Sequence, residues 1–104
     1  GMMRADGFTF EYTSSQVSIE EAWNHKLISI YPNPASDFIN INIDSRIEGV
    51  INKVELLNPQ GQQIDSKSAD DLSIVFRIDQ LPQGIYFIRL CNENEDIVRP
   101  IEVF

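Results

Sequence analysis

Apolar and polar side chains alternate along much of this chain, and this pattern limits the possible folds more than any other feature. In residues 38–43, three isoleucines are separated by two asparagines. Residues 72–78 repeat the pattern, with Leu, Ile, Phe and Ile at alternate positions. Because successive side chains of a strand point to opposite faces of its sheet, each segment predicts a strand that is buried on one side.

Further segments of this kind recur at intervals of about 8–12 residues, with Pro and Gly turns between them. We expect strands at residues 27–31, 38–43, 50–57, 62–66, 72–78, 84–91 and 97–104. In residues 50–57, either Val54 and Leu56 or Ile51 and Leu57 face inward, depending on the register. The segments between the strands are too short for crossover helices, so the strands pair antiparallel. The prediction is an all-β sandwich of about seven strands.

Two turn residues and one strand residue indicate the local backbone structure at their positions. In Asn58-Pro59-Gln60-Gly61, proline fixes φ and glycine accepts a positive φ, so the segment predicts a β-turn. Pro100 cannot donate a ladder hydrogen bond, so it predicts an edge position for the last strand.

Residues 1–26 lack this regular pattern, and we expect them to form an N-terminal extension before a domain of residues 27–104. Gly1 before Met2 is typical of a cleaved expression tag. Residues 8–12 alternate and predict a short strand. Ser18 and Glu21 have the spacing of a capping box, which predicts a helical turn, although a linker is the alternative. Trp23 would then cap the sandwich or contact another domain.

Charge excludes several classes of partner. Eight Lys and Arg face 16 Asp and Glu, for a net charge of −8. Such a surface repels phosphate backbones and anionic membranes, so we expect neither nucleic-acid binding nor direct membrane insertion. It favours solubility and cationic partners.

Three motifs follow one another in the domain. They are Tyr31-Pro32-Asn33-Pro34 with Asp37, then residues 54–64 around the Asn-Pro-Gln-Gly turn, then Leu81-Pro82-Gln83-Gly84-Ile85-Tyr86. In order and spacing, residues 28–104 resemble the C-terminal sorting domain of proteins exported by the type IX secretion system of Bacteroidetes.

The resemblance implies an Ig-like antiparallel β-sandwich attached to a larger exported protein. Its partners would be secretion machinery proteins at the outer membrane and its own upstream cargo domain. The protein would reach the medium or the cell surface through the periplasm of a Gram-negative bacterium. The domain would have no enzymatic activity. The last strand lacks the lysines common in this family, which favours an alternative: a stand-alone secreted adhesion or scaffold domain that binds protein or glycan.

The first motif supplies the candidate recognition residues, Tyr31, Pro32, Asn33, Pro34 and Asp37. The two prolines disfavour helix and predict a stiff extended arm. Asn33 and Asp37 can hold a local turn through their side chains. The arm is either a rigid lead into the next strand or, where exposed, a surface that the machinery reads.

The third motif supplies structural residues. Leu81, Gly84 and Tyr86 resemble the tyrosine corner of Ig-like folds, in which the Tyr hydroxyl bonds an upstream backbone group. We expect Tyr86 to point inward.

We expect neither catalytic residues, nor a metal, nor a cofactor. Asn92, Asn94 and Asp96 alternate as in a calcium loop, but the glycine and the later bidentate carboxylate of such a loop are missing. His25 is the only histidine, which argues against zinc. Cys91 is the only cysteine, so no intrachain disulfide forms, and it falls in a core-like strand where a nucleophile would lack a base.

Overall fold

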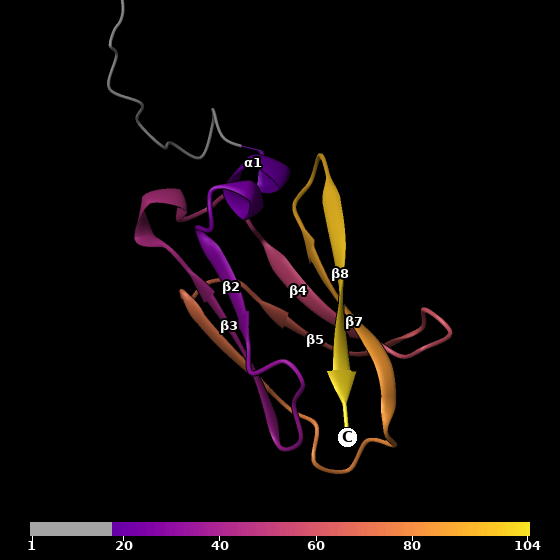
Figure 1. Cartoon of the computed structure of the whole chain (residues 1–104). Helices are drawn as coiled ribbons and strands as arrows, with labels where there is room; N and C mark the ends of the chain where they lie inside the picture. Colours follow the sequence, from indigo (N-terminus) through magenta and orange to yellow (C-terminus); the bar gives the residue numbers. More distant parts are fainter. Residues whose placement is uncertain (1–17) are drawn as a thin grey trace, which may run out of the picture.

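The alternating segments form two antiparallel β-sheets that face each other, as Figure 1 shows. This is a computed structural model, and it describes residues 18–104. One sheet has the strand order β2 (Ile28–Tyr31), β3 (Phe38–Ile43), β6 (Ser73–Arg77). The other has the order β5 (Gln63–Ser68), β4 (Lys53–Leu57), β7 (Gly84–Cys91), β8 (Asp96–Val103). The predicted Ig-like sandwich of antiparallel strands is confirmed.

The core fills the space between the two sheets with branched aliphatic side chains. Its largest fully buried members include Phe76, Ile39 and Ile41 from one sheet, and Leu56, Ile88 and Leu90 from the other. Because β-branched side chains pack well on a pleated surface, an isoleucine-rich interior suits this architecture.

Strand β4 settles the register that the sequence left open. Val54 and Leu56 are buried and alternate with Lys53 and Glu55. Leu57 and Ile51 are buried as well. Val54 and Leu56 belong to the core between the sheets, whereas Leu57 does not. Ile51 belongs to the core too, but it precedes the strand.

Strand bounds differ from the prediction mainly around β4. The strand begins at Lys53 and not at residue 50, because a short 3-10 helix, η1 (Ser45–Ile47), comes first and the Val50 amide bonds the Ile47 carbonyl oxygen. Strand β8 lies at the edge of its sheet, as Pro100 predicted. The strand predicted for residues 8–12 lies outside the described residues.

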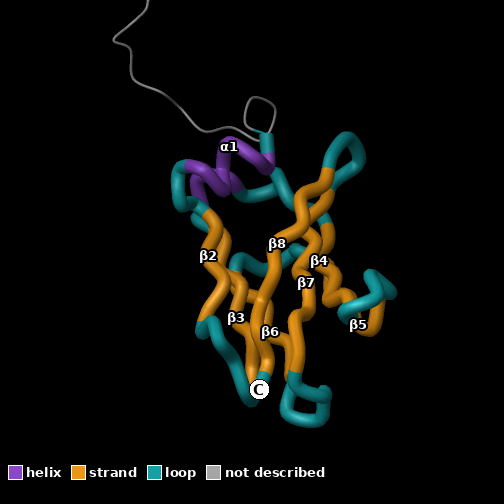
Figure 2. Tube along the Cα trace, turned by 45° about the vertical axis from the view of Figure 1, so that its right-hand side comes forward, coloured by secondary structure: helices purple, strands orange, loops and turns teal. Residues whose placement is uncertain are grey.

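A short helix, α1 (Ile19–Asn24), closes one end of the sandwich (Figure 2). Both halves of the predicted capping box are formed: the Glu21 amide donates to Ser18 Oγ over 3.0 Å, and the Ser18 amide to Glu21 Oε1 over 3.1 Å. Ile19 and Ala22 are buried in the same core as the strands, and Trp23 packs against it. The helical interpretation is therefore confirmed over a linker.

None of the described helices has the length and apolar character needed to cross a lipid bilayer.

Candidate recognition site

The first motif connects the two sheets at the end opposite α1. After β2, residues 32–37 form an arm that reaches the edge of β8. There Ala35 pairs in parallel with Val103. The Ala35 amide donates to the Glu102 carbonyl oxygen over 2.8 Å, and the Phe104 amide donates to the Ala35 carbonyl oxygen over 3.0 Å. The arm thus adds main-chain pairing to the last strand.

Asn33 extends this pairing with its side chain. Its Oδ1 accepts a hydrogen bond from the Glu102 amide over 3.0 Å, so both main-chain groups of Glu102 are bonded to the arm. In the same arm, the Asp37 carbonyl oxygen accepts from the Ile78 amide over 2.9 Å. The arm is thus fixed to β8 and its end, and to the end of β6.

The arm is not extended, contrary to the sequence prediction. Its backbone bends at Asn33 and Pro34, and both peptide bonds that precede its prolines are cis. The physical reason is topological: the chain leaves one sheet, touches the edge of the other at Ala35 and returns to β3. An extended segment could not make that excursion.

The candidate recognition residues lie on the surface. Tyr31, Pro32, Asn33, Pro34 and Asp37 are all exposed. Only Ala35, the residue that pairs with β8, is buried within the arm. The five side chains therefore form part of one accessible and anchored surface.

The second and third motifs meet at a pocket near this end. The Tyr86 hydroxyl donates to the Pro82 carbonyl oxygen over 2.7 Å, which is the contact that defines a tyrosine corner. Gly84 lies beside Pro59 of the turn, and a Cβ there would sit 3.9 Å from the proline ring. Gly84 also pairs with Val103, the strand residue that bridges to Ala35. All three motifs are thus connected around the end of β8.

The Asn58 side chain holds the turn of the second motif. Its Oδ1 accepts from the amides of Gln60 and Gln62, over 3.0 and 2.9 Å. Gly61 has a φ of +86°, which is the conformation the sequence predicted for it.

The pocket between the turn and the corner carries no charge. Its volume is about 390 Å³, and its lining is Asn58, Pro59, Gln60, Ile64, Leu81, Pro82, Gln83 and Tyr86. In a chain of net charge −8, an uncharged concave surface differs from its surroundings.

Sequence comparison assigns this arrangement to a family. The family model described as secretion system C-terminal sorting domain matches residues 29–103. The chain belongs to this family. The resemblance to type IX sorting domains, inferred from the three motifs, is confirmed. Domains of this family are signals for export to the cell surface or the medium.

A solved structure supports the fold of the sorting domain. PorZ, an essential bacterial surface component of the type IX secretion system of Porphyromonas gingivalis, superposes with a TM-score of 0.63 at 12% identity. The match covers 80% of this chain but 12% of the PorZ chain, so the sorting domain spans a small part of that protein's length. A search of curated protein sequences gives no significant match.

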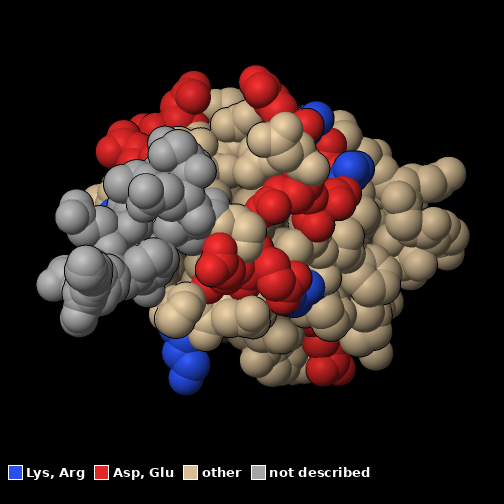
Figure 3. All heavy atoms as spheres, turned by 90° about the horizontal axis from the view of Figure 1, so that it is seen from above, with Lys and Arg blue, Asp and Glu red and all other residues tan. Residues whose placement is uncertain are grey.

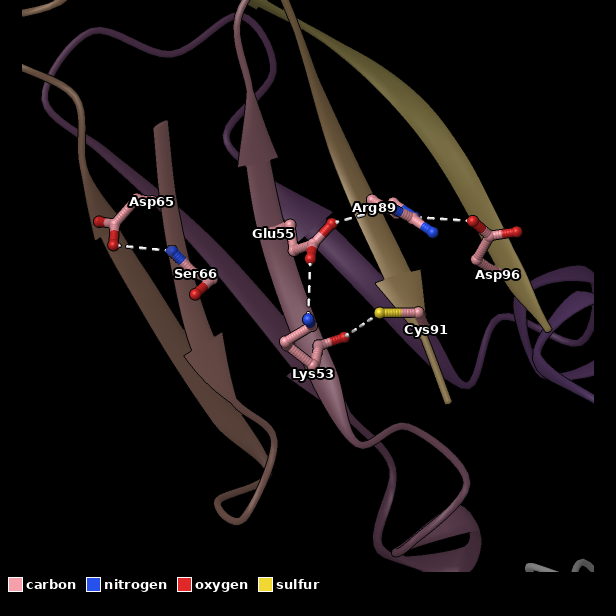
Figure 4. A network of polar contacts seen from close by, with 7 residues as sticks. All are labelled: Lys53, Glu55, Asp65, Ser66, Arg89, Cys91 and Asp96. Carbon is pink, nitrogen blue, oxygen red and sulfur yellow. Dashed lines mark hydrogen bonds and ion pairs between the residues drawn. The ribbon is translucent and has the colours of Figure 1, made fainter. Parts of the chain in front are cut away.

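The sequence did not predict a buried carboxylate on the outer face of the four-stranded sheet of the sorting domain. Figure 4 shows Glu55 between two basic side chains. Its carboxylate lies 3.0 Å from Lys53 Nζ and 3.2 Å from Arg89 Nη1, and Arg89 Nε also bonds Asp96 over 2.6 Å. With 4% of its surface exposed, Glu55 is the buried charged residue of the described chain. Both of its oxygens are engaged, so it does not present a free acid or base.

Cys91 lies beside this network and is unsuited to act as a nucleophile. Burial raises the pKa of its thiol, and the charge of Glu55 raises it further. The thiol therefore stays protonated near neutral pH and bonds the Lys53 carbonyl oxygen at 3.5 Å.

The polar turn between β7 and β8 is held by its own side chain. Asn92 Oδ1 accepts from the amides of Asn94 and Glu95, over 2.8 and 3.0 Å. This is the side-chain turn that asparagine favours. Across residues 18–104, no group of three or more His, Cys, Asp or Glu side chains is arranged to hold a metal ion.

Proposed function

We propose that this domain is a non-catalytic sorting signal, attached to a larger exported protein and recognised by type IX machinery at the outer membrane. The observation that carries the proposal is the family match over residues 29–103, which spans all three motifs. The host would be a Gram-negative bacterium of the Bacteroidetes, and the attached protein would pass through the periplasm.

The geometry of the arm supports a recognition role. Four of the five candidate residues lie in the arm and Tyr31 ends β2, and all five are exposed. The arm itself is held by hydrogen bonds to Glu102, Phe104 and Ile78. A surface that is already ordered loses little conformational entropy when a partner binds it. The arm therefore suits recognition better than a free loop would.

The chemistry of the described residues supports a non-catalytic role. Glu55 is neutralised by two basic partners, and Cys91 is a protonated thiol bonded to a carbonyl oxygen. General acid–base or nucleophilic catalysis needs a group whose pKa and exposure suit the reaction. Neither of these groups meets that need.

A fusion experiment tests the proposal. The whole chain is joined to the C-terminus of a reporter that carries a periplasmic export signal, in a host with a working type IX system and in a translocon-deletion strain. We expect the reporter at the surface or in the medium of the first strain only. A reporter that stays in the periplasm of the competent host would contradict the proposal.

Matched carboxylate variants test the arm itself. Asp37→Ala removes an exposed side chain of the arm and keeps the Asp37 carbonyl that bonds Ile78. Glu48→Ala removes an exposed carboxylate after η1. We expect the arm variant alone to lower export. Equal export by both variants would remove Asp37 from the recognition surface.

One feature favours the second candidate, a stand-alone adhesion or scaffold domain. Strand β8 has a single basic residue, Arg99, and that side chain is engaged with Glu20 at 3.1 Å and the Trp23 ring at 5.0 Å. The native reading frame discriminates the two functions, because a long upstream coding region fits only the sorting signal.

A further inference from the structure

The four outer edges of the two sheets differ in how their main-chain groups are used. The edge of β8 is obstructed at three positions. Glu102 bonds the arm through both main-chain groups, Pro100 has no amide hydrogen, and the Val98 carbonyl oxygen accepts from Arg99 Nη1 over 2.9 Å. Such devices prevent another strand from pairing with an edge.

The edge of β5 is obstructed at one position. Pairing of Ala69 with Asn52 directs the main-chain groups of Lys67 and Asp65 toward β4, so those of Ser66 and Ser68 point outward. The outward amide of Ser66 donates to the carboxylate of Asp65 over 2.8 Å, a contact drawn in Figure 4.

The edge of β2 is short and covered. The Asp44 amide donates to the Leu27 carbonyl oxygen, so odd-numbered residues of this strand bond β3 through their main chain. The main-chain groups of Ile28 and Ile30 therefore point outward. Ile28 is 4% exposed, so a partner could reach the main chain of one residue at most.

The edge of β6 is open. The Ile78 amide bonds the Asp37 carbonyl oxygen, and the Ile43 amide bonds the Leu72 carbonyl oxygen. The main-chain groups of the even-numbered residues of β6 therefore point toward β3. The main-chain groups of Ser73, Val75 and Arg77 therefore point outward, and all three residues are exposed. Within residues 18–104, nothing bonds those outward groups.

The sheet face next to this edge carries exposed apolar side chains. Val75 is 37% exposed, and Phe38 and Tyr31 are 48% and 45% exposed on the neighbouring strands of the same face. Tyr31 is held there, because its hydroxyl accepts from Asn42 over 2.7 Å. Aromatic side chains of this kind are enriched where proteins bind each other.

Charge at the ends of β6 indicates what would pair with it. Asp70 and Asp71 precede the strand and are exposed, and Asp79 follows it. The only basic side chain of β6, Arg77, is already bonded to Asp79 over 3.0 Å. An added strand would therefore meet unbalanced negative charge near Ser73, which basic residues of a partner would complement.

We propose that β6 binds an extended segment of a partner protein as an added strand, with Lys or Arg at the end that lies beside Asp70 and Asp71. Main-chain bonds to Ser73, Val75 and Arg77 would supply affinity, and side chains packed on Val75 would supply specificity. This inference rests on the proposed function, and the partner is then a protein of the export machinery.

A proline substitution tests strand addition. Val75→Pro removes an outward amide hydrogen and leaves the groups that bond β3 unchanged. Val98→Pro is the matched control, because Val98 has the same outward orientation on the obstructed edge of β8. In the reporter fusion, we expect Val75→Pro to lower export on the order of tenfold, because the partner strand loses one main-chain hydrogen bond. We expect Val98→Pro to export normally.

A second pair of variants keeps the test valid if proline perturbs folding. Asp70→Asn with Asp71→Asn removes the charge beside β6, and Glu48→Gln with Glu93→Gln removes as much charge elsewhere. We expect only the first pair to lower export. Circular dichroism and urea unfolding check that every variant is folded.

Three outcomes are decisive. Export of wild type with normal export of both the β6 and the Asp70/Asp71 variants overturns strand addition and leaves the sorting function intact. Failure of wild type itself counts against the sorting function. A wild-type dimer in solution that Val75→Pro converts to monomer overturns the proposed partner in favour of a second copy of this chain.

Discussion

Two tyrosines of this chain show how burial decides what a hydroxyl contributes. Tyr86 and Tyr31 each have a hydrogen-bond partner at 2.7 Å. Tyr86 is 3% exposed and donates to a carbonyl oxygen, whereas Tyr31 is 45% exposed on the sheet surface. Water can reach the hydroxyl of Tyr31, whereas the hydroxyl of Tyr86 belongs to a buried side chain and depends on the Pro82 carbonyl oxygen.

We therefore predict that Tyr86→Phe lowers the free energy of unfolding by about 1–3 kcal/mol, because the Pro82 carbonyl oxygen loses its donor. Tyr31→Phe is the control and changes stability by about 0.5 kcal/mol or less. Urea unfolding of the two variants measures the difference. Equal effects would show that the corner bond adds nothing to the fold.

Asp44 gives the chain an acid-sensitive contact. Arg46 bonds its carboxylate over 3.0 and 2.9 Å, and these bonds, with the Arg46 amide, lower the pKa of Asp44 from 3.8 to about 2. The charged form favours the folded state, so its contribution is complete above pH 3.8 and is lost as the pH falls toward 2.

We predict that Asp44→Asn makes the free energy of unfolding less dependent on pH between 4 and 2 than in wild type. Urea unfolding at a series of pH values measures this slope. Asp71→Asn, at an exposed carboxylate, is measured beside it as the control. An unchanged slope in Asp44→Asn would exclude this contact as a source of acid sensitivity.

Among the elements, the arm and β8 depend on each other. Strand β8 is an edge strand, and the arm covers its last residues where β7 alone would leave one side unpaired. Edge strands with free main-chain groups tend to pair with other chains. The arm thus protects the end of the chain while it presents its own side chains.

We expect Asn33→Ala to weaken the contact between the arm and β8. The variant removes the acceptor of the Glu102 amide, and we expect hydrogen exchange at that amide to accelerate on the order of tenfold. Asn94→Ala removes a side chain that has no role in the arm. Exchange measured by NMR compares the two, and unchanged protection of Glu102 in Asn33→Ala would mean that Ala35 alone holds this contact.

The whole molecule has one core, which extends from the two sheets to α1. Ile19 and Ala22 of α1 share the core with both sheets, and the Ile19 amide bonds a Glu95 side-chain oxygen beside β8. Seen from the α1 end, acidic side chains gather over the surface (Figure 3). The pocket between the second and third motifs is uncharged.

A shared core predicts a single unfolding transition. Trp23 is the only tryptophan, lies in α1 and packs against the core, so its fluorescence reports the helix, while far-ultraviolet circular dichroism reports the sheets. We expect both probes to give the same urea midpoint. Separate midpoints would mean that α1 is a unit apart from the sandwich.

Features that depend on neighbours in the chain were predictable from the sequence. The strands, the capping box of Ser18, the positive φ of Gly61 and the edge position of Pro100 all follow from local periodicity or from the backbone limits of one residue. The three family motifs could be recognised for the same reason, because each is a short run of residues whose prolines and glycines restrict the local backbone.

Only the tertiary structure decided which distant residues meet. Asn33 and Glu102 are 69 positions apart, and nothing local to either one predicts their hydrogen bond. The burial of Glu55 and the open edge of β6 likewise depend on strand order, which brings β7 beside β4 and leaves β6 at a margin. Alternation determines that a strand has an inner and an outer face, but long-range packing determines which strand lies next to it.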